Sequence, residues 1–132
     1  MKLGNQILGP ADFSFDYFIN NGFIGCSCSK CAEKLIITIQ LHNSGKPVDQ
    51  IIDEFDETIL NQLIEHKIVN LNRDGKQGDL GFSKYILWHL DALYSIITCK
   101  SCSFNFLAIF GIGEIQPGRD QVQFKGIWEL KD

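Results

Sequence analysis

The sequence predicts an α+β protein in which a helical, winged-helix-like segment is inserted between two zinc knuckles, with an antiparallel β-hairpin at the C-terminus. Three observations lead to this fold class. All five cysteines of the 132 residues lie in two short clusters, CSCSKC at 26–31 and CKSC at 99–102. The segment 46–75 has apolar residues at helical spacing. Two apolar runs near the end of the chain flank QPGRD, a typical turn sequence.

The region before the first cysteine cluster carries short signals. Residues 10–20, PADFSFDYFIN, are expected to form a short helix or an irregular lead-in, because Pro10 suits the first turn of a helix. The NNG sequence at 20–22 predicts a turn. The FIGC sequence at 23–26 is then expected to enter the first cysteine cluster as a short extended piece.

Residues 32–43 fit two patterns. One set of apolar residues alternates as in a strand: Leu35, Ile37, Ile39 and Leu41. A second set has helical spacing: Ala32, Leu35, Ile36 and Ile39. Gly45 is typical of the position after a helix end, and a helical segment follows, so this context favours a helix.

The segment 46–75 gives the clearest helical pattern. Pro47 suits the first turn of a helix, and Asp56 suits the N-cap of a second one. The two helices share an expected apolar core stripe: Val48, Ile51, Ile52, Phe55, Ile59, Leu60, Leu63 and Ile64. KIVNLNRDG then predicts a strand that runs into a turn. This succession of helices, strand and turn is the order of a winged helix.

The C-terminal third is expected to contain one more helix and a hairpin. Ser83 is a possible cap for a helix over 84–95, which leads into an extended piece before Cys99. Strands are expected near 104–114 and 121–130, paired antiparallel. Pro117 and Gly118 fit a type II turn between them.

The cysteine spacing predicts one structural zinc site. A CxxC turn offers two thiolates, and two such turns complete a tetrahedron, so the expected ligands are Cys28, Cys31, Cys99 and Cys102. Cys26 is the alternative to Cys28, and otherwise a buried thiol. Redox or disulfide chemistry and independently buried thiols are the competing interpretations. A catalytic zinc is disfavoured, because four thiolates leave no open position.

Composition limits the remaining function classes. The chain has 45% hydrophobic and 21% charged residues, as is typical of a globular protein. Its length predicts a single domain, 1–132, in which 99–130 contains the second knuckle and the hairpin. No signal peptide or membrane-length apolar run is seen, so we expect a soluble cytoplasmic protein. No internal repeat and no catalytic constellation is evident, so no enzyme is expected. The net charge of −4 favours a basic or neutral partner over nucleic acid.

At the level of motifs, the four cysteines of CSKC and CKSC resemble the paired knuckles of zinc-ribbon-like proteins. KPVDQIIDEFDETILNQLIEHKIVNL is similar to the winged-helix portion of many bacterial proteins, in particular leader-peptide-binding domains of peptide-modifying systems. In size, acidity and lack of catalytic groups, the chain is also similar to bacterial immunity proteins that neutralise toxin domains.

The leading hypothesis is therefore a non-enzymatic, zinc-stabilised inhibitor of immunity type that binds a basic toxin domain. The expected partner-binding residues are acidic: Asp53, Glu54, Asp56, Glu57 and Glu65. The alternative is a winged-helix and zinc-knuckle module that binds nucleic acid or peptide. The expected recognition helix, 57–66, contains no Lys or Arg, which counts against a nucleic-acid partner. The sequence does not indicate an oligomeric state.

Overall fold

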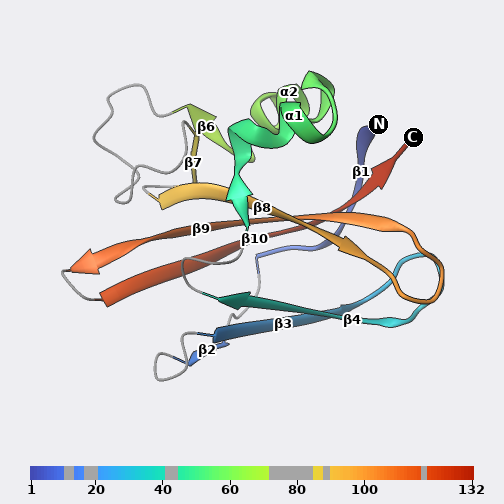
Figure 1. Cartoon of the computed structure of the whole chain (residues 1–132), viewed down its shortest axis with the longest axis horizontal. Helices are drawn as coiled ribbons and strands as arrows, with labels where there is room; N and C mark the ends of the chain where they lie inside the picture. Colours follow the sequence, from blue (N-terminus) through green and yellow to red (C-terminus); the bar gives the residue numbers. More distant parts are fainter. Residues whose placement is uncertain (11–13, 17–20, 41–44, 72–84, 88–89, 117–118) are drawn as a thin grey trace.

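A computed structural model describes residues 1–10, 14–16, 21–40, 45–71, 85–87, 90–116 and 119–132 (Figure 1). The described chain is mostly β-strand, arranged in two antiparallel sheets. The larger sheet has the order β1 (Lys2–Leu8), β10 (Arg119–Lys131), β9 (Asn105–Gln116), β8 (Leu90–Thr98), β7 (Tyr85–Leu87) and β6 (Asn70–Leu71), with β5 (Lys46–Pro47) paired to β8. The smaller sheet has the order β2 (Ser14–Asp16), β3 (Asn21–Ser27) and β4 (Lys34–Gln40).

The small sheet and the helices cover opposite faces of the large sheet. Strands β3 and β4 run along β9 and β10 on one side, and α1 (Ile51–Glu54) and α2 (Glu57–Glu65) lie on the other (Figure 1). The buried residues form two clusters that match these two faces. One cluster joins the helices to the large sheet, and the other joins the small sheet to it. The large sheet is therefore the middle layer of three.

The sequence of β9 is apolar throughout, without alternation of apolar and polar residues, and its position in the fold explains why. Leu107 and Ile109 belong to the cluster beneath the helices, whereas Phe106, Ala108 and Phe110 belong to the cluster beneath the small sheet. Successive side chains of a strand point to opposite faces. A strand covered on both faces therefore needs an apolar residue at nearly every position.

The expected fold class is wrong, because the chain between the knuckles is not a helical segment. Residues expected to form a helix over 84–95 form β7 and most of β8 instead. In β8, Leu90, Ala92 and Leu93 are all buried, because both faces of the strand are covered. Such a run of buried residues matches helical spacing by chance, and periodicity alone does not separate the two structures.

Three further expectations are corrected. Residues 34–40 form strand β4 rather than a helix, and Leu35 and Ile37 are buried, while Ile36 is 61% exposed. The N-terminal lead-in contains the short strand β2, and Asn21 already begins β3 where a turn was expected. The extended piece at 23–26 is confirmed as part of β3.

The helical segment is confirmed only in part. Val48–Gln50 forms a 3₁₀ turn, and α1 has only four residues. Helix α2 begins as expected, because the Asp56 carboxylate accepts a hydrogen bond from the Thr58 backbone N–H at 2.9 Å. The strand that follows, β6, belongs to the large sheet and does not form the wing of a winged helix.

The apolar stripe of these helices is also divided. Ile51, Ile59 and Leu63 are fully buried, but Ile52 and Ile64 are 47% and 39% exposed, so these two are not core residues as expected. The C-terminal hairpin is confirmed, since β9 and β10 pair antiparallel along almost their full length. The expected cap at Ser83 and the turn at 117–118 lie outside the described residues.

Candidate metal centre

The two cysteine motifs are the end loops of two β-hairpins. Cys28–Cys31 lies in the connection from β3 to β4, which closes at the pair Ser27 and Lys34. Cys99–Cys102 lies in the connection from β8 to β9, which closes at the pair Thr98 and Asn105. The two connections have the same length. One hairpin belongs to the small sheet and the other to the large sheet, so the packing of the sheets brings the two loops together at one end of the molecule (Figure 1).

Both loops have the same backbone hydrogen bonds. In the first, Ala32 N–H donates to the Cys28 carbonyl at 2.9 Å, and Cys28 N–H donates to the Glu33 carbonyl at 2.7 Å. In the second, the equivalent bonds are Ser103 N–H to Cys99 and Cys99 N–H to Phe104, both at 2.9 Å. We call these loops, residues 28–33 and 99–104, the first and second knuckle.

The knuckles also share an unusual backbone conformation. Ala32 has φ of 65° and Ser103 has φ of 63°, both in the left-handed region that favours glycine. These two residues follow the last cysteine of each motif. This likeness concerns the backbone, and the sequence itself still shows no evident repeat beyond the cysteine spacing. Strands β3–β4 and the adjoining parts of β8–β9 repeat the same hairpin at a constant offset, although their sequences share little beyond the cysteine spacing.

The four sulfur atoms form one compact cluster. The Sγ atoms of Cys28, Cys31, Cys99 and Cys102 all lie within 4.8 Å of one another. Across the knuckles, Cys28 Sγ lies 3.7 Å from Cys102 Sγ, and Cys31 Sγ lies 3.5 Å from Cys99 Sγ. These distances exceed the ~2.05 Å of a disulfide bond, and the cysteines are free. They are close to the ~3.8 Å expected between sulfurs around tetrahedral zinc with Zn–S bonds of ~2.3 Å.

Backbone N–H groups point at these sulfurs. Lys30 N–H donates to Cys28 Sγ at 3.4 Å. Backbone N–H groups, first that of Cys102 and then that of Ser101, lower the pKa of Cys99 to about 7. For Cys31, the N–H of Glu33 acts in the same direction, but burial and the neighbouring sulfurs outweigh it and raise the pKa to about 12. The backbone N–H groups of the second knuckle thus favour the thiolate of Cys99. The short distances between the four sulfurs oppose the ionisation of a second thiol. A bound divalent cation would remove that opposition.

The cluster lies at the surface and is half accessible. Cys28 and Cys99, the first cysteines of each motif, are buried, whereas Cys31 and Cys102 are exposed. Two buried sulfurs fix the inner side of the site, and two exposed ones leave a route from solvent. The structure therefore brings together the four cysteines that the spacing predicted, with Cys28 rather than Cys26 in the cluster.

Cys26 lies in β3, outside the sulfur cluster. It is partly buried and packs against the apolar cluster between the two sheets. Burial raises the pKa of its thiol. Its surroundings are those of a structural thiol, as expected with Cys28 as the ligand, and not those of the alternative ligand.

A buried carboxylate supports the first knuckle, and the sequence analysis missed it. Glu129 in β10 is 4% exposed, and its Oε2 accepts a hydrogen bond from the Ser29 hydroxyl at 2.7 Å. Its Oε1 accepts from Asn5 N–H at 3.2 Å, and Lys30 and Lys131 are within ion-pair distance. The Ser29 hydrogen bond is the main cause that keeps the pKa of Glu129 below its usual range. No sequence signal relates Glu129 to the cysteines, because it lies 100 residues from Ser29.

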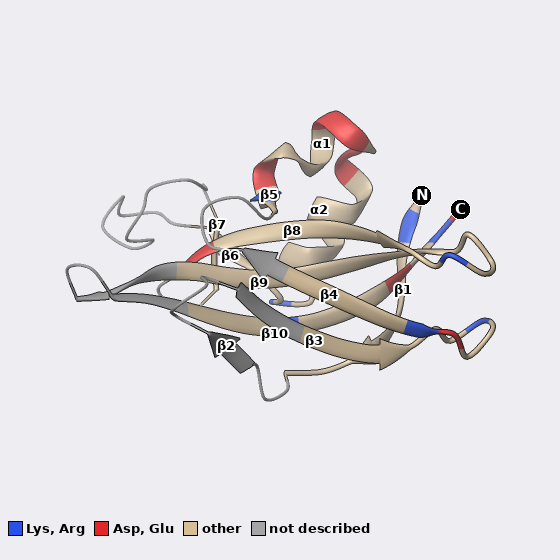
Figure 2. Cartoon of the chain, turned by 60° about the horizontal axis from the view of Figure 1, so that its bottom comes forward, with Lys and Arg blue, Asp and Glu red and all other residues tan. Residues whose placement is uncertain are grey.

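The predicted acidic residues lie on the helices, away from the knuckles (Figure 2). All five are exposed. Glu54 forms an ion pair with Lys46, and Asp56 caps α2. Within the described part of the chain, Asp53, Glu57 and Glu65 form no salt bridge. We call these five acids, with the exposed Ile52 and Ile64, the acidic helix face.

Comparison with known proteins gives no relative. No family model matches the chain, and no curated protein or solved structure is significantly similar to it. Within the described residues, no helix has the length and apolar character needed to cross a membrane.

Proposed function

We propose that this chain is a non-enzymatic binding protein whose two sheets are joined by one structural zinc ion. The observation that carries the proposal is the cluster of four sulfurs contributed by two separate hairpins. Four thiolates in one compact cluster are a preferred ligand set for zinc. Four protein ligands fill the coordination of such an ion, so its role is to hold the knuckles together rather than to bind a substrate.

The acidic helix face is the proposed binding surface. The same two helices carry these acids and two large apolar side chains that solvent reaches, Ile52 and Ile64. Exposed apolar residues within a charged rim are typical of a protein-binding surface. The negative rim would favour a partner with a basic surface and would speed the encounter at low salt. We therefore propose a basic protein as the partner, and a bacterial toxin domain neutralised by this chain as its specific form.

The experiment uses the zinc-loaded protein and a charge-reversed variant of two acids that form no salt bridge, Asp53→Lys with Glu57→Lys. The matched control is Glu33→Lys, an exposed acid in the first knuckle. Proteins retained from the source cells are identified and then expressed alone and with each variant. The proposal expects a basic partner that is toxic alone, is neutralised by the wild-type and control chains, and associates more slowly with the double variant at low salt.

The proposal is wrong if the double variant binds and neutralises the partner at the wild-type rate in low salt. It is also wrong if the retained protein is acidic. Removal of zinc before the experiment tests the structural role of the ion separately from partner binding by the acidic helix face. The ion should be required for stability, but should not itself contact the partner.

A second candidate surface lies at the knuckles. Lys34 and Lys100 are exposed and line a groove of about 240 Å³ that also includes Ile36 and Ile97. Glu33 also lines the groove, so its two lysines leave a small positive excess, which favours an acidic partner, either a peptide or a single-stranded nucleic acid. Retention on heparin that is lost in Lys34→Glu with Lys100→Glu would support it. Wild-type retention by that variant would exclude it.

A further inference from the structure

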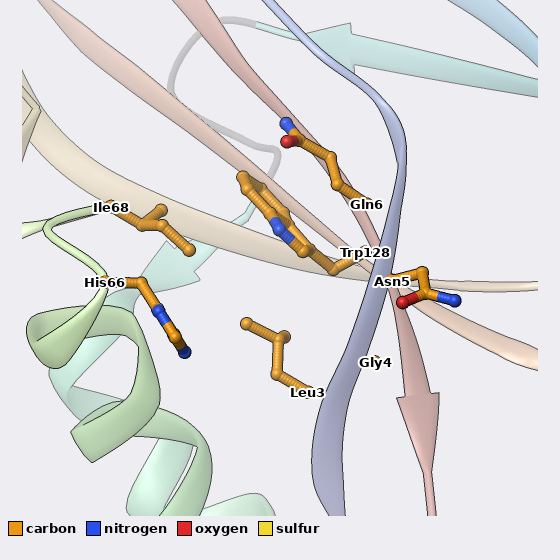
Figure 3. A pocket seen from close by; sticks show the side chains of 7 residues that line it. All are labelled: Leu3, Gly4, Asn5, Gln6, His66, Ile68 and Trp128. Carbon is orange, nitrogen blue, oxygen red and sulfur yellow. The ribbon is translucent and has the colours of Figure 1, made fainter.

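A cavity of about 380 Å³ lies at the opposite side of the large sheet from β3 and β4, between edge strand β1 and the end of α2 (Figure 3). Leu3 and its neighbours in β1 form one wall. His66 and Ile68, just after α2, form the facing wall, and Trp128 of β10 forms the floor. This cavity is distinct from both the sulfur cluster and the acidic helix face.

Backbone irregularities shape the cavity. The pairing of β1 with β10 shifts register between Leu3 and Gln6 and again between Gln6 and Leu8, so β1 bends along this stretch. Gly126, with φ of 154°, lets β1 lie close to β10, since a Cβ there would clash with Gln6 Nε2 and with the Leu8 carbonyl. Bulges of this kind often lie beside binding sites.

The two walls are held at a fixed distance. Leu3 N–H donates a hydrogen bond of 2.7 Å to Oε1 of Gln62 in α2, which ties the open edge of β1 to the helix. Lys67, with φ of 58°, ends the helix in the left-handed conformation. The imidazole of His66 then extends toward Leu3, on the cavity side of the helix end (Figure 3). The cavity is therefore built by fixed elements, as binding sites for small molecules usually are.

Trp128 supplies the specific polar group. The residue is 94% buried, since only 6% of its surface is exposed. Within the described residues, its indole N–H forms no hydrogen bond. The nitrogen lies on the edge of the ring that faces His66 and Leu3 (Figure 3). Among the described residues, the buried side-chain atom without a partner is the Tyr94 hydroxyl, so the Trp128 N–H is open to solvent in the cavity, where a ligand acceptor can take the place of water.

The lining limits the chemistry of the ligand. It contains no Asp, Glu, Lys or Arg, so a charged ligand would find no counter-ion. Trp128 and His66 present aromatic rings, Leu3 and Ile68 present apolar surface, and Asn5 and Gln6 add neutral polar groups, which suit a ring that carries polar atoms. Aromatic and apolar walls favour a flat ring. We propose that this cavity binds a neutral planar heteroaromatic ring whose carbonyl or ring nitrogen accepts the indole N–H of Trp128. His66 donates or accepts a second hydrogen bond at the rim.

The experiment follows the Trp128 indole N–H signal in the NMR spectrum of the full zinc-loaded chain. Trp88→Phe removes the signal of the other tryptophan and so assigns that of Trp128. The probes are uracil and nicotinamide as neutral rings with a carbonyl, cyclohexanol as a neutral ring that is not planar, and acetate as an anion. Uridine and uridine 5′-monophosphate distinguish a free base or nucleoside from a phosphate-bearing source.

We expect uracil or nicotinamide to move this signal with a dissociation constant near ~1 mM or below. His66→Ala should weaken binding by about tenfold, the value of one lost hydrogen bond, while Asn61→Ala on the same helix should not. Trp128→Phe keeps an aromatic ring and removes the donor, and should weaken binding at least as much; its binding is followed through the backbone amide signals of the lining residues Leu3 and Ile68. Uridine should bind at least as tightly as its monophosphate, because no cation lines the cavity.

Several outcomes would overturn the assignment. One is the absence of any shift with either neutral ring at about 10 mM. Another is equal binding of cyclohexanol or acetate, which would show that neither planarity nor an acceptor on a neutral ring matters. A third is the same affinity for His66→Ala and Asn61→Ala, and a fourth is tighter binding of the monophosphate. Because His66 is exposed, its removal should leave the fold intact, so that variant stays informative even if Trp128→Phe does not fold.

Discussion

The two knuckles have the same backbone but very different surroundings. The second knuckle ends β8 and β9, which pair over eight consecutive residue pairs in the middle layer of the molecule. The first knuckle ends β3 and β4, two strands of the small three-stranded sheet. The second knuckle therefore extends from strands of a sheet that is covered on both faces. The first knuckle extends from the small sheet, which is held in place by its contacts with the large sheet.

Three contacts of the first knuckle replace this missing support. Ser29 donates to Glu129, Lys30 lies 4.9 Å from the centre of the Phe104 ring, and the sulfurs of Cys28 and Cys31 face those of the second knuckle. A cation over an aromatic ring is a modest attraction. We therefore expect a metal bound by the four cysteines to add chiefly to the attachment of the small sheet, which also packs on the large sheet through a buried apolar cluster.

The largest expected effect is that of a lost ligand. Cys99→Ser should lose the metal and several kcal/mol of unfolding free energy, on the scale of structural zinc sites. Native mass spectrometry and chemical denaturation measure the two quantities. Cys28→Ala should behave alike, and Cys26→Ala is the matched control that should keep the ion. Full occupancy with unchanged stability in Cys99→Ser would refute the metal centre.

Removal of the metal should affect the two hairpins unequally. After chelation of the reduced protein, we expect hydrogen exchange to accelerate more in β3 and β4 than in β8 and β9, because the former keep only the apolar cluster to hold them to the large sheet, whereas β8 and β9 remain paired within it. The measurement is amide exchange by mass spectrometry with and without chelator. Equal acceleration in both hairpins would show that the large sheet needs the metal as much as the small one.

The carboxylate beneath the first knuckle gives a pH-dependent test. Its pKa is lowered in the folded state from an ordinary value of 4.5, so its contribution is present above that pH and is lost as pH falls through the lower folded value. Glu129→Gln should cost about 1–3 kcal/mol at pH 7, because a buried charge-assisted hydrogen bond is removed. The difference from wild type should shrink below about pH 4.5.

Glu65→Gln, an exposed carboxylate in α2, is the control for this measurement. Urea unfolding of the three proteins between pH 7 and the acid limit separates the cases. If the Glu129→Gln difference stays constant across this range, the ionised form of Glu129 does not support the knuckle.

The smallest expected effect concerns the shared left-handed residues. Ala32→Gly and Ser103→Gly should each raise stability by up to about 1 kcal/mol, because glycine adopts this conformation without the strain of a side chain. Lys100→Gly, where the structure shows no positive φ, should lower it instead. Thermal unfolding of the zinc-loaded variants measures these differences. Destabilisation at both Ala32 and Ser103 would contradict the common knuckle geometry.

Local signals in the sequence predicted those features that depend on local spacing. The CxxC spacing predicted the four clustered cysteines, Asp56 marked the start of α2, and the runs around QPGRD predicted the β9–β10 hairpin. Each of these is decided within a few residues. The preference for Cys28 over Cys26 also followed from spacing alone.

Apolar periodicity does not identify a strand that is buried on both faces. In β8, residues such as Leu90, Ala92 and Leu93 are buried together, so the strand lost the alternation that would have identified it. In β4 the alternation is present, with Leu35 buried and Ile36 exposed, but the helical pattern that follows it in the sequence favours a helix. The helix was inferred from context, and the context was itself partly wrong.

By itself, the sequence determined the cysteine set, one helix start, the final hairpin and the acidic character of the chain. Tertiary structure decided that the two knuckles belong to different sheets, that Glu129 lies beneath Ser29, and that Trp128 faces a cavity between β1 and α2. These relations join residues far apart in the chain. They depend on which faces pack together, and a face is covered or open only once the sheets have assembled.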